Sequence, residues 1–455
     1  MALDVVPAVA PARPELAVPE TLAEPGRERF MHLVPVMVDR PPRVAILGLG
    51  YVGLPTALAL LEAGTDVVGI DVSSKRLAAI RSRRVDLSPL DHGRLAKALR
   101  GRRLSLSRRS SDLARADTVI VAVPTPVDEH LIPDLSILEA ACASVVAAAR
   151  AGQTIILTST SYVGCTRDLL VRPLERRGFT VGEDIFVAFS PERIDPGNVT
   201  FPQERVPRVV GGVTPECLRR AVRVVGAVAP FTHQVSSPEV AEMAKLHENI
   251  FRAVNIALAN EMADVARGMG IDVTEVIQAA STKPYGFMPF SPGPGVGGHC
   301  IPCDPYYLLW QLRRERVEAP LIEQAMTSIA RRPRQVVARA AEVMAERNQT
   351  LRGAHVIVVG VAYKPGVEDV RESPALEIMQ RLLDAGAQVA FADRLVDWFR
   401  VGSHEVFAER EPARGRWDLA IVHTFDPAMD LNWLDRVPAV LDASFRVKSL
   451  GVFTL

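Results

Sequence analysis

The stretch from Arg43 to Asp71 reads RVAILGLGYVGLPTALALLEAGTDVVGID. Its start, 44–47, is a short apolar run typical of a buried parallel strand. A Gly-x-Gly-x-x-Gly turn follows at 48–53, then a helical pattern over 54–63 and a second apolar run over 66–70. Strand, glycine turn, helix and strand in this order predict the start of a Rossmann-like fold.

The same turn predicts a dinucleotide. Its glycines permit a tight turn and close approach of a pyrophosphate, whose charge meets the helix N-terminus. Asp71, which ends the second strand, is placed to accept hydrogen bonds from the adenosine ribose, and it repels a 2′-phosphate, so NAD is favoured over NADP. The alternative is a turn that only packs helix on strand. The expected cofactor contacts here are Gly48, Gly50, Tyr51, Val52, Gly53, Asp71 and Arg76.

Three further strand patterns continue the α/β alternation, at 117–123, 154–157 and 185–189. Thr125, Thr160 and Glu192 each lie just beyond the end of one of them. Ligands of open α/β sheets bind outside the carboxyl ends of the strands, so all three are site candidates. Taken singly, each could be only a cap or turn residue.

One long helix of ~30 residues is predicted between Ser237 and Met269, because neither Gly nor Pro interrupts the pattern from Glu239 until Gly268. Lys245, Asn249 and Arg252 share one face at i, i+4 and i+7. They could line a polar groove or form an ordinary solvated stripe. The helix could also join two globular halves and self-associate.

The loop 292–308 reads PGPGVGGHCIPCDPYYL and places Cys300 among glycines and prolines. A cysteine thiolate is a strong nucleophile once its pKa is lowered. Asp304 follows one helical turn later. The alternative is a tight turn beside a buried, inert cysteine. Cys300 and Cys303 form a C-x-x-C, but no second Cys pair or nearby His pair completes a zinc set, so no metal is expected.

A second α/β unit is predicted after two helices, at 308–331 and 334–347. Its strand patterns lie at 355–359, 388–392, 419–422 and 439–441, and Ser373 is placed to cap a helix that begins at Pro374. Lys364 and Arg371 stand near the end of its first strand and suit a phosphate or diphosphate. The fold class is therefore α/β, with two Rossmann-like doubly wound domains joined by a long central helix.

Composition sets further bounds. The 455 residues suggest two to three domains, and 53 basic residues balance 53 acidic ones, which argues against a general nucleic-acid or membrane-surface binder. Five scattered cysteines indicate a reducing compartment, the cytoplasm. Residues 1–40 show no signal peptide and are expected to form a mobile tail or a surface strap. No stretch reaches the ~20 apolar residues of a membrane helix.

Five motifs in order resemble the UDP-glucose/GDP-mannose dehydrogenase family over about 43–450. They are the glycine turn 48–55, Ser-Pro-Glu-Arg at 190–193, Lys245-x-x-x-Asn249, Gly-Gly-His-Cys at 297–300 with Asp304, and Ala-Tyr-Lys at 362–364 followed by 369–374. Beyond the tail at 1–40, the resemblance implies an NAD-binding domain at 41–236, a central dimerisation domain with the Cys loop at 237–333, and a UDP-binding domain at 334–455.

The resemblance also implies a chemistry. A sugar C6 alcohol is oxidised twice to a carboxylate with two NAD, through a thiohemiacetal and a thioester on Cys300. Lys245 and Asn249 would steady the C6 oxygen, Asp304 and a water near Thr160 would handle protons, and Glu192 would activate the hydrolytic water. Thr125, Thr160 and Arg371 would complete the cofactor site. The UDP-sugar contacts would be Arg193, Ile194, Lys245, Asn249, Arg252, Gly297, Tyr363 and Lys364.

The sugar is harder to read. His299 and the following Pro-Tyr-Tyr resemble the branch that acts on UDP-N-acetylhexosamines, and 286–295 favours UDP-N-acetylglucosamine; UDP-N-acetylmannosamine and UDP-glucose remain alternatives. The chain departs from the family pattern at Thr158, Cys303, Ile329 and 444–446. A non-catalytic NAD-binding scaffold or sensor, and a Rossmann dehydrogenase that makes one oxidation, are the competing classes.

Overall fold

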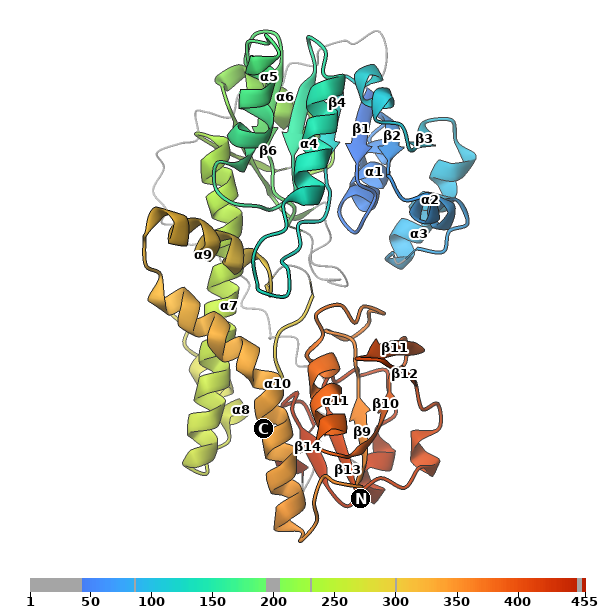
Figure 1. Cartoon of the computed structure of the whole chain (residues 1–455), viewed down its shortest axis with the longest axis vertical. Helices are drawn as coiled ribbons and strands as arrows, with labels where there is room; N and C mark the ends of the chain where they lie inside the picture. Colours follow the sequence, from blue (N-terminus) through green and yellow to red (C-terminus); the bar gives the residue numbers. More distant parts are fainter. Residues whose placement is uncertain (1–42, 86, 194–204, 230, 299–300, 448–451) are drawn as a thin grey trace.

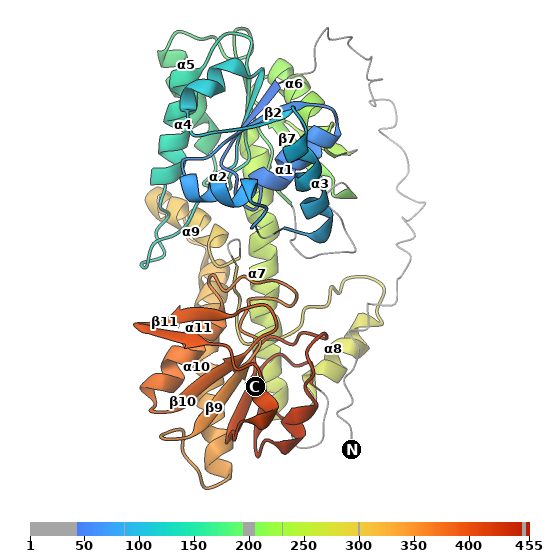
Figure 2. The same ribbon diagram turned by 90° about the vertical axis from the view of Figure 1, so that its right-hand side faces the viewer.

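The structure is a computed structural model, and it describes residues 43–85, 87–193, 205–229, 231–298, 301–447 and 452–455. The predicted tail at 1–40 lies outside these residues. Two α/β bodies lie one above the other, and a single long helix, α7, runs from the upper body along the lower one (Figure 1). The view turned by 90° shows the same connection (Figure 2). The predicted fold class, two doubly wound domains joined by a long helix, is confirmed.

The amino-terminal body is built on an eight-stranded sheet in the order β3-β2-β1-β4-β5-β6-β7-β8. Neighbouring strands are parallel except for the antiparallel pair β6–β7. The chain reverses its direction of strand addition between β1 and β4, where open α/β sheets bind ligands. The strands are β1 (Arg43–Leu47), β2 (Asp66–Ile70), β3 (Leu104–Ser107), β4 (Thr118–Val121), β5 (Thr154–Leu157), β6 (Phe186–Phe189), β7 (Arg208–Gly212) and β8 (Thr232–Val235).

Helices cover both faces of this sheet, which explains why its central strands are apolar throughout rather than alternating. On one face Ile46 and Ile156 pack with Leu54 and Leu58 of α1. On the other face the alternate strand residues pack with Val145 of α4 and its neighbours. The helices are α1 (Gly53–Glu62), α2 (Ser74–Arg81), α3 (Pro89–Arg100), α4 (Ser136–Ala148), α5 (Arg172–Arg176) and α6 (Pro215–Val225), with short turns η2 (Ser110–Arg115) and η3 (Arg167–Val171).

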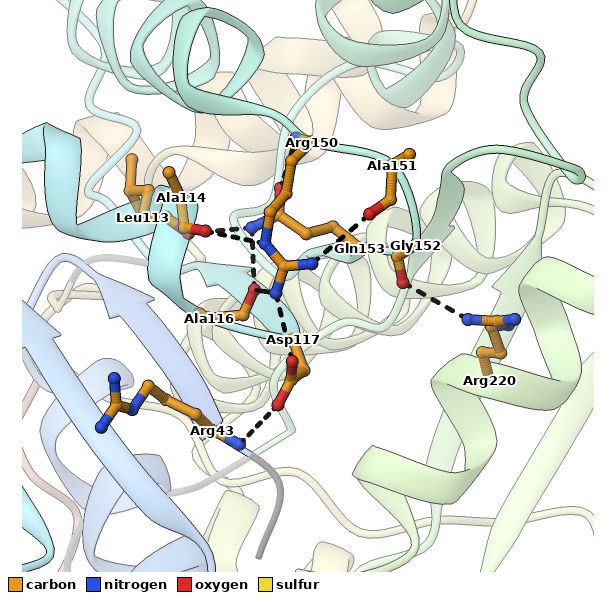
Figure 3. Close-up of polar contacts among 10 residues, drawn as sticks. All are labelled: Arg43, Leu113, Ala114, Ala116, Asp117, Arg150, Ala151, Gly152, Gln153 and Arg220. Carbon is orange, nitrogen blue, oxygen red and sulfur yellow. Dashed lines mark hydrogen bonds and ion pairs between the residues drawn. The ribbon is translucent and has the colours of Figure 1, made fainter. Parts of the chain in front are cut away.

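The amino ends of β1, β4 and β5 are fastened by a polar cluster around Arg150 (Figure 3). Its guanidinium donates to the carbonyl oxygens of Ala114, at 2.7 Å, and Ala116, at 2.9 Å, and pairs with Asp117 at 3.1 Å. Gln153 adds a hydrogen bond of 2.9 Å to the same Ala116 oxygen. These contacts satisfy buried backbone carbonyls at the edge opposite the strand carboxyl ends, so we interpret them as structural.

The predicted long helix is confirmed as α7 (Pro238–Gly268), with 31 residues. The Ser237 side chain caps it by accepting from the Val240 amide, and Pro238 occupies its first position. Three further helices follow: α8 (Val273–Ser281), α9 (Asp304–Glu315) and α10 (Pro320–Glu346).

The predicted helix break between Arg331 and Arg334 is wrong. The chain breaks earlier, where Arg316 adopts a φ of 58° after α9, and α10 then continues through Pro333. A proline inside a helix removes one hydrogen bond and strains the preceding turn, but packing of α10 against α7 holds the helix together. The proposed domain boundary at 333/334 therefore falls inside a helix.

The carboxyl-terminal body has a five-stranded parallel sheet in the order β10-β9-β13-β14-β15. Its strands are β9 (His355–Val359), β10 (Gln388–Ala392), β13 (Leu419–Val422), β14 (Val440–Asp442) and β15 (Val452–Thr454). Helix α11 (Pro374–Asp384) is capped by Ser373 as predicted. The hairpin β11 (Trp398–Val401) and β12 (His404–Phe407), the turns η5 (Pro412–Arg414) and η6 (Asn432–Arg436), and strands β3, β7, β8 and β15 were not predicted.

The two bodies repeat one local structure. In each, the first strand ends at a glycine with positive φ, 93° at Gly48 and 72° at Gly360. An aspartate after the second strand then accepts from the amide that follows this glycine: Asp71 from Leu49 at 3.0 Å, and Asp393 from Val361 at 2.8 Å. None of the described helices is long and apolar enough to cross a membrane.

Candidate active site

Three polar side chains meet where α7 crosses the start of α9. Lys245 and Asn249 lie one turn apart on α7 and are 9% and 8% exposed, and Asp304 begins α9 at 4% exposed. The Asn249 side-chain amide donates a hydrogen bond to the Asp304 carboxylate. Buried polar groups are costly unless they are satisfied by one another, so this group is a strong site candidate.

Burial dominates the electrostatics of Asp304. Removal from water raises the pKa of its carboxyl to about 6, against the opposing effects of the Lys245 ammonium and the hydrogen bond from Asn249. A carboxyl with a pKa near 6 can exchange a proton at neutral pH, which is the property expected of a general acid–base group.

Cys300 and His299, and the substrate candidate Ile194, lie outside the described residues. The chain on either side of Cys300 is described, and its two flanks are fastened to different bodies. Before it, the amide of Gly298 donates to the Arg371 carbonyl at 3.2 Å, so this flank follows the carboxyl-terminal body. After it, Tyr307 on α9 donates to the Pro126 carbonyl at 3.3 Å, in the amino-terminal body. The described residues before and after Cys300 thus contact different bodies.

The loop before Cys300 touches the carboxyl-terminal body so closely that side chains are excluded. A Cβ at Gly297 would lie 2.6 Å from the Tyr363 Cβ and 2.7 Å from the Glu372 carbonyl oxygen. A Cβ at Gly295 would lie 2.8 Å from the Pro374 ring. These glycines are therefore required by the contact itself, rather than only by the turn.

The glycine turn fits a dinucleotide. A Cβ at Gly48 would lie 2.5 Å from the Ala122 oxygen and one at Gly53 would lie 1.9 Å from the Gly48 oxygen, so both positions need glycine for packing. A Cβ at Gly50 would meet no atom within 4 Å, so the turn leaves the open space that the close approach of a pyrophosphate requires. Val52 precedes the first residue of α1.

Asp71 and Arg76 brace this turn. The Asp71 carboxylate accepts from the amides of Leu49, at 3.0 Å, and Ser73, at 2.9 Å, while Arg76 donates to the Leu49 carbonyl at 2.7 Å. Each carboxylate oxygen can accept a further hydrogen bond, so these contacts leave Asp71 able to receive ribose hydroxyls.

Arg371 links the cofactor turn to the carboxyl-terminal body. Its guanidinium lies over the ring of Tyr51, 4.5 Å from the centroid, and Asp369 holds it through hydrogen bonds of 3.0 and 2.7 Å. Charged hydrogen bonds to Asp369 raise the pKa of Arg371 further, so it remains cationic. A cation over the glycine turn is placed to meet a dinucleotide phosphate.

The strand-end candidates differ in their surroundings. Thr125 is buried and its side chain hydrogen-bonds the Tyr307 hydroxyl. Thr160 is half-buried after β5. Glu192 is engaged by Arg208, at 2.6 Å, in a nearly buried ion pair that the sequence did not reveal. Arg208 lies on β7, a strand that was not predicted.

The expected UDP-sugar contacts are only partly brought together. Arg193 pairs with Glu248 of α7 at 2.7 Å, so it lies beside the helix of Lys245. Tyr363 and Lys364 lie in the loop that follows β9, with the Lys364 ammonium 5.8 Å from the Tyr363 ring centroid. Arg252 was predicted to line one polar groove with Lys245 and Asn249. Its side chain is exposed, however, while Lys245 and Asn249 are buried.

Two residues that the sequence did not single out, Arg332 and Asn260, hold the start of the Cys loop against the long helices. Arg332 of α10 is 1% exposed and donates to the Gly293 carbonyl at 3.0 Å and to Asp264 at 2.7 Å. Asn260 accepts from the Gly293 amide at 2.8 Å. Both α7 and α10 thus hydrogen-bond to the backbone at the start of the Cys loop. A buried arginine gives no pattern in a single sequence that distinguishes it from an exposed one.

No metal centre is evident in the part of the chain that the structure describes, where no three His, Cys, Asp or Glu residues gather with suitable geometry. The four described cysteines, Cys142, Cys165, Cys217 and Cys303, are buried and outside any disulfide. Burial raises the pKa of Cys142 to about 12, so this thiol is inert at neutral pH.

Comparison with known proteins gives matches along nearly the whole described chain. Three domains of the UDP-glucose/GDP-mannose dehydrogenase family match: the NAD binding domain at 42–227, the central domain at 239–329 and the UDP binding domain at 357–446.

Two curated relatives and one solved structure illustrate the similarity. The UDP-N-acetyl-D-glucosamine 6-dehydrogenase of Pseudomonas aeruginosa is 36% identical over 394 residues, which are 84% of this chain and 90% of the relative. The UDP-N-acetyl-D-mannosamine dehydrogenase of Escherichia coli K12 is 35% identical over 74% of this chain and 81% of its own. The UDP-D-ManNAc dehydrogenase structure from Pyrococcus horikoshii has a TM-score of 0.83 at 31% identity, covering 90% of this chain and 98% of that one.

Proposed function

This chain belongs to the UDP-glucose/GDP-mannose dehydrogenase family, and we propose that it oxidises the C6 hydroxyl of a UDP-N-acetylhexosamine to the carboxylate in two steps. It is an NAD-dependent nucleotide-sugar dehydrogenase. The best candidate for the sugar is N-acetylglucosamine, with N-acetylmannosamine as the alternative.

The observation that supports catalysis most is the buried group of Lys245, Asn249 and Asp304. A scaffold or sensor that only binds NAD gains nothing from a carboxyl whose burial raises its pKa to about 6. Such a group opposes folding at neutral pH, and buried ionisable groups of this kind cluster at active sites. The geometry therefore favours an enzyme over the non-catalytic class.

Bound NAD supplies the hydride acceptor for both oxidations. The chain's own residues supply binding and proton transfer. Lys245 and Asn249 hold the C6 oxygen as negative charge develops on it, because an ammonium and an amide N–H stabilise an oxyanion in a buried site. Asp304, with Lys245 and a water held near Thr160, accepts the proton released from the C6 hydroxyl.

The second oxidation requires a nucleophile, and we assign it to Cys300. Its thiolate adds to the C6 aldehyde to form a thiohemiacetal, whose oxidation gives a thioester. Water then cleaves the carbon–sulfur bond, which releases the carboxylate and restores the thiol. Glu192 activates that water in this scheme, and its pairing with Arg208 fixes the carboxylate in place. A tethered aldehyde cannot escape between the two oxidations.

The choice of sugar rests on the Cys loop and on the relatives. The 286–300 stretch favours an acetamido sugar, and the two curated relatives described above are named for UDP-N-acetylglucosamine and UDP-N-acetylmannosamine. The proposed contacts from the carboxyl-terminal domain are Tyr363, Lys364 and Arg371. We place the reaction in the cytoplasm, in the synthesis of surface polysaccharide precursors.

A homodimer is part of the proposal. Apolar side chains on α7 are exposed in the single chain, among them Phe251 at 43% and Leu258 at 55%. A long helix with such a face is suited to packing against a second copy. Sedimentation of the purified protein tests this directly, and a monomer at micromolar concentration would contradict it.

A substrate panel tests the proposed reaction. UDP-N-acetylglucosamine, UDP-N-acetylmannosamine, UDP-glucose and GDP-mannose are each supplied with NAD, and NADH is counted against sugar consumed. We expect two NADH per sugar and fastest turnover of UDP-N-acetylglucosamine. One NADH per sugar would show a single oxidation, and faster turnover of UDP-glucose would show that the Cys loop has been misread.

A further inference from the structure

We propose that Glu242 and Gln311 are positioning residues, which fasten the segment Ser159–Thr166 to α7 and α9 and so hold Thr160 in register with Lys245, Asn249 and Asp304. This inference rests on the proposed function, in which Thr160 holds a water for proton transfer. Neither residue was a site candidate from the sequence.

Glu242 connects the segment to α7. Its side chain is 2% exposed, and its carboxylate accepts three hydrogen bonds: from the Gly164 amide at 2.6 Å, the Thr166 amide at 2.9 Å and the Thr166 hydroxyl at 2.6 Å. The acceptor therefore sits at the start of the helical region that leads into η3, where backbone N–H groups have no partner within the helix.

Gln311 connects the same segment to α9. Its Oε1 accepts from the Val163 amide at 3.0 Å, and its Nε2 donates to the Val163 carbonyl at 3.0 Å. One side chain thus satisfies both polar groups of a single residue, as a neighbouring strand would. The ring of Tyr162 lies 5.7 Å from that of Trp310, the residue before Gln311.

The other end of the segment is tied to the sheet. The Thr158 hydroxyl donates to the Val121 carbonyl at 2.7 Å, and the Ser159 hydroxyl donates to the Val123 carbonyl at 2.8 Å. Thr160 lies in the chain between these anchors, on β4 and just after it, and the anchors on α7 and α9. Its position is therefore set by both sides at once, by the NAD-binding sheet and by the two helices of the buried polar group.

Helix geometry explains why these two anchors matter. Glu242 precedes Lys245 by three residues and Asn249 by seven, so all three share one face of a rigid helix. Gln311 follows Asp304 by seven residues on α9, again on one face. On each helix, therefore, residues of one face contribute to the buried polar group, and another residue of the same face contacts the segment Ser159–Thr166. A shift of the segment changes the distance between Thr160 and that group.

Glu242 differs from other residues that anchor α7 in how deeply its carboxylate is buried. Burial raises the pKa of Glu242, although hydrogen bonds from Thr166 and Gly164 oppose the shift. A second carboxylate of α7, that of Glu239, lies nearer the surface and pairs with Arg167 of η3, the element that directly follows the segment. Glu239 is therefore the matched control, because it ties α7 to the adjoining η3 through Arg167, which lies outside residues 159–166.

The test compares Glu242→Gln and Gln311→Met with Glu239→Gln in the full-length protein. Misplacement of a group by about 1 Å can lower the rate of a chemical step by up to about 100-fold. We expect kcat to fall about 10- to 100-fold in the first two variants, while KM for the UDP-sugar and the dissociation constant for NAD stay within about threefold. Glu239→Gln should keep wild-type kcat, and a fall equal to that of Glu242→Gln would overturn the inference.

A second background shows whether the effect passes through Thr160. In Thr160→Ala, the further change Glu242→Gln should lower the melting temperature as before but should lower kcat no more than about twofold, because the group being positioned is absent. Equal losses of kcat in both backgrounds would show a merely structural role. If Thr160→Ala alone leaves kcat unchanged, the proposed proton route fails, and this inference fails with it. If Thr160→Ala lowers kcat but Glu242→Gln and Gln311→Met do not, only this inference fails.

Discussion

Asn249 of α7 donates a hydrogen bond from its side-chain amide to the carboxylate of Asp304 at the first turn of α9, and both side chains are buried. The two residues are 55 positions apart in the chain. Their contact joins the long central helix to the helix that follows the Cys loop, and it fixes the orientation of a carboxyl beside the Lys245 ammonium. The proposed proton transfer by Asp304 depends on this hydrogen bond.

Asp304 makes stability depend on pH. Burial raises its pKa from 3.8 to about 6 in the folded chain, so the unfolded chain releases this proton at a lower pH than the folded chain does. Stability is therefore lost as pH rises between about 4 and 6, and the loss is complete above that window. Relative to Asp304→Asn, the wild type should lose at most about 3 kcal/mol across this range. Urea unfolding of both proteins at pH 4.5 and 7.5 measures it, and parallel curves would contradict the assignment.

The same carboxyl should shape the pH profile of the reaction. If ionised Asp304 accepts a proton, kcat falls as pH drops below about 6. In Asp304→Asn that limb should vanish, and kcat should be lower by about 100-fold or more at pH 8, within the range typical of acid–base groups. Steady-state rates with saturating UDP-sugar from pH 5 to 9 give the profile. An unchanged limb in the variant would assign it to another group.

Cys300→Ser should abolish sustained turnover while leaving UDP-sugar binding intact, because a hydroxyl is a far weaker nucleophile than a thiolate. Cys303→Ser is the matched control. Cys303 is buried immediately before α9, and we expect its replacement to change kcat by less than about threefold. NADH released per enzyme and intact mass after quenching distinguish the two sulfurs. Two NADH per sugar at near wild-type rate from Cys300→Ser would exclude the covalent route.

Asp71 should decide between the two dinucleotides. The carboxylate lies where a 2′-phosphate would meet like charge, so kcat/KM should favour NAD over NADP by at least about tenfold, the effect of one contact worth more than about 1 kcal/mol. Asp71→Asn should narrow that ratio. It should also raise KM for NAD, because Asp71 accepts from the amides of Leu49 and Ser73. Equal use of both cofactors by the wild type would contradict the reading of this site.

Gly297→Ala should impair the enzyme while Gly293→Ala should not. A Cβ at Gly297 would lie 2.7 Å from the backbone oxygen of Glu372, whereas a Cβ at Gly293 would meet nothing within 4 Å. The first change forces the Cys loop away from the carboxyl-terminal body. We expect kcat/KM for the UDP-sugar to fall about 100-fold, a loss typical of groups displaced by about 1 Å. Gly293→Ala should remain within about twofold, and similar losses in both variants would mean that the contact is unimportant.

Local patterns predicted much of the fold. Apolar runs over 44–47 and 355–359 predicted buried parallel strands because both faces of such a strand are covered, and the uninterrupted stretch after Ser237 predicted α7 because helix periodicity is a local property. Strands β3, β7, β8 and β15 were missed. Strands β7 and β8 have few distinguishing residues, and α10, which packs against α7, continues through Pro333 although a proline usually ends a helix.

For the candidate site, the sequence by itself determined which chemical groups are available: a glycine turn followed by Asp71, the Lys245–Asn249 spacing, and a cysteine loop followed by Asp304. Spacing within one helix or turn fixes such relations, since they need no distant contact. Only the tertiary structure decided that Asn249 donates a hydrogen bond to Asp304 and that Arg208 forms an ion pair with Glu192. The same holds for the hydrogen bonds of Glu242 and Gln311 to the segment Ser159–Thr166. Each of these joins different elements of the fold, and burial, which a single sequence does not reveal, sets the strength of the contact.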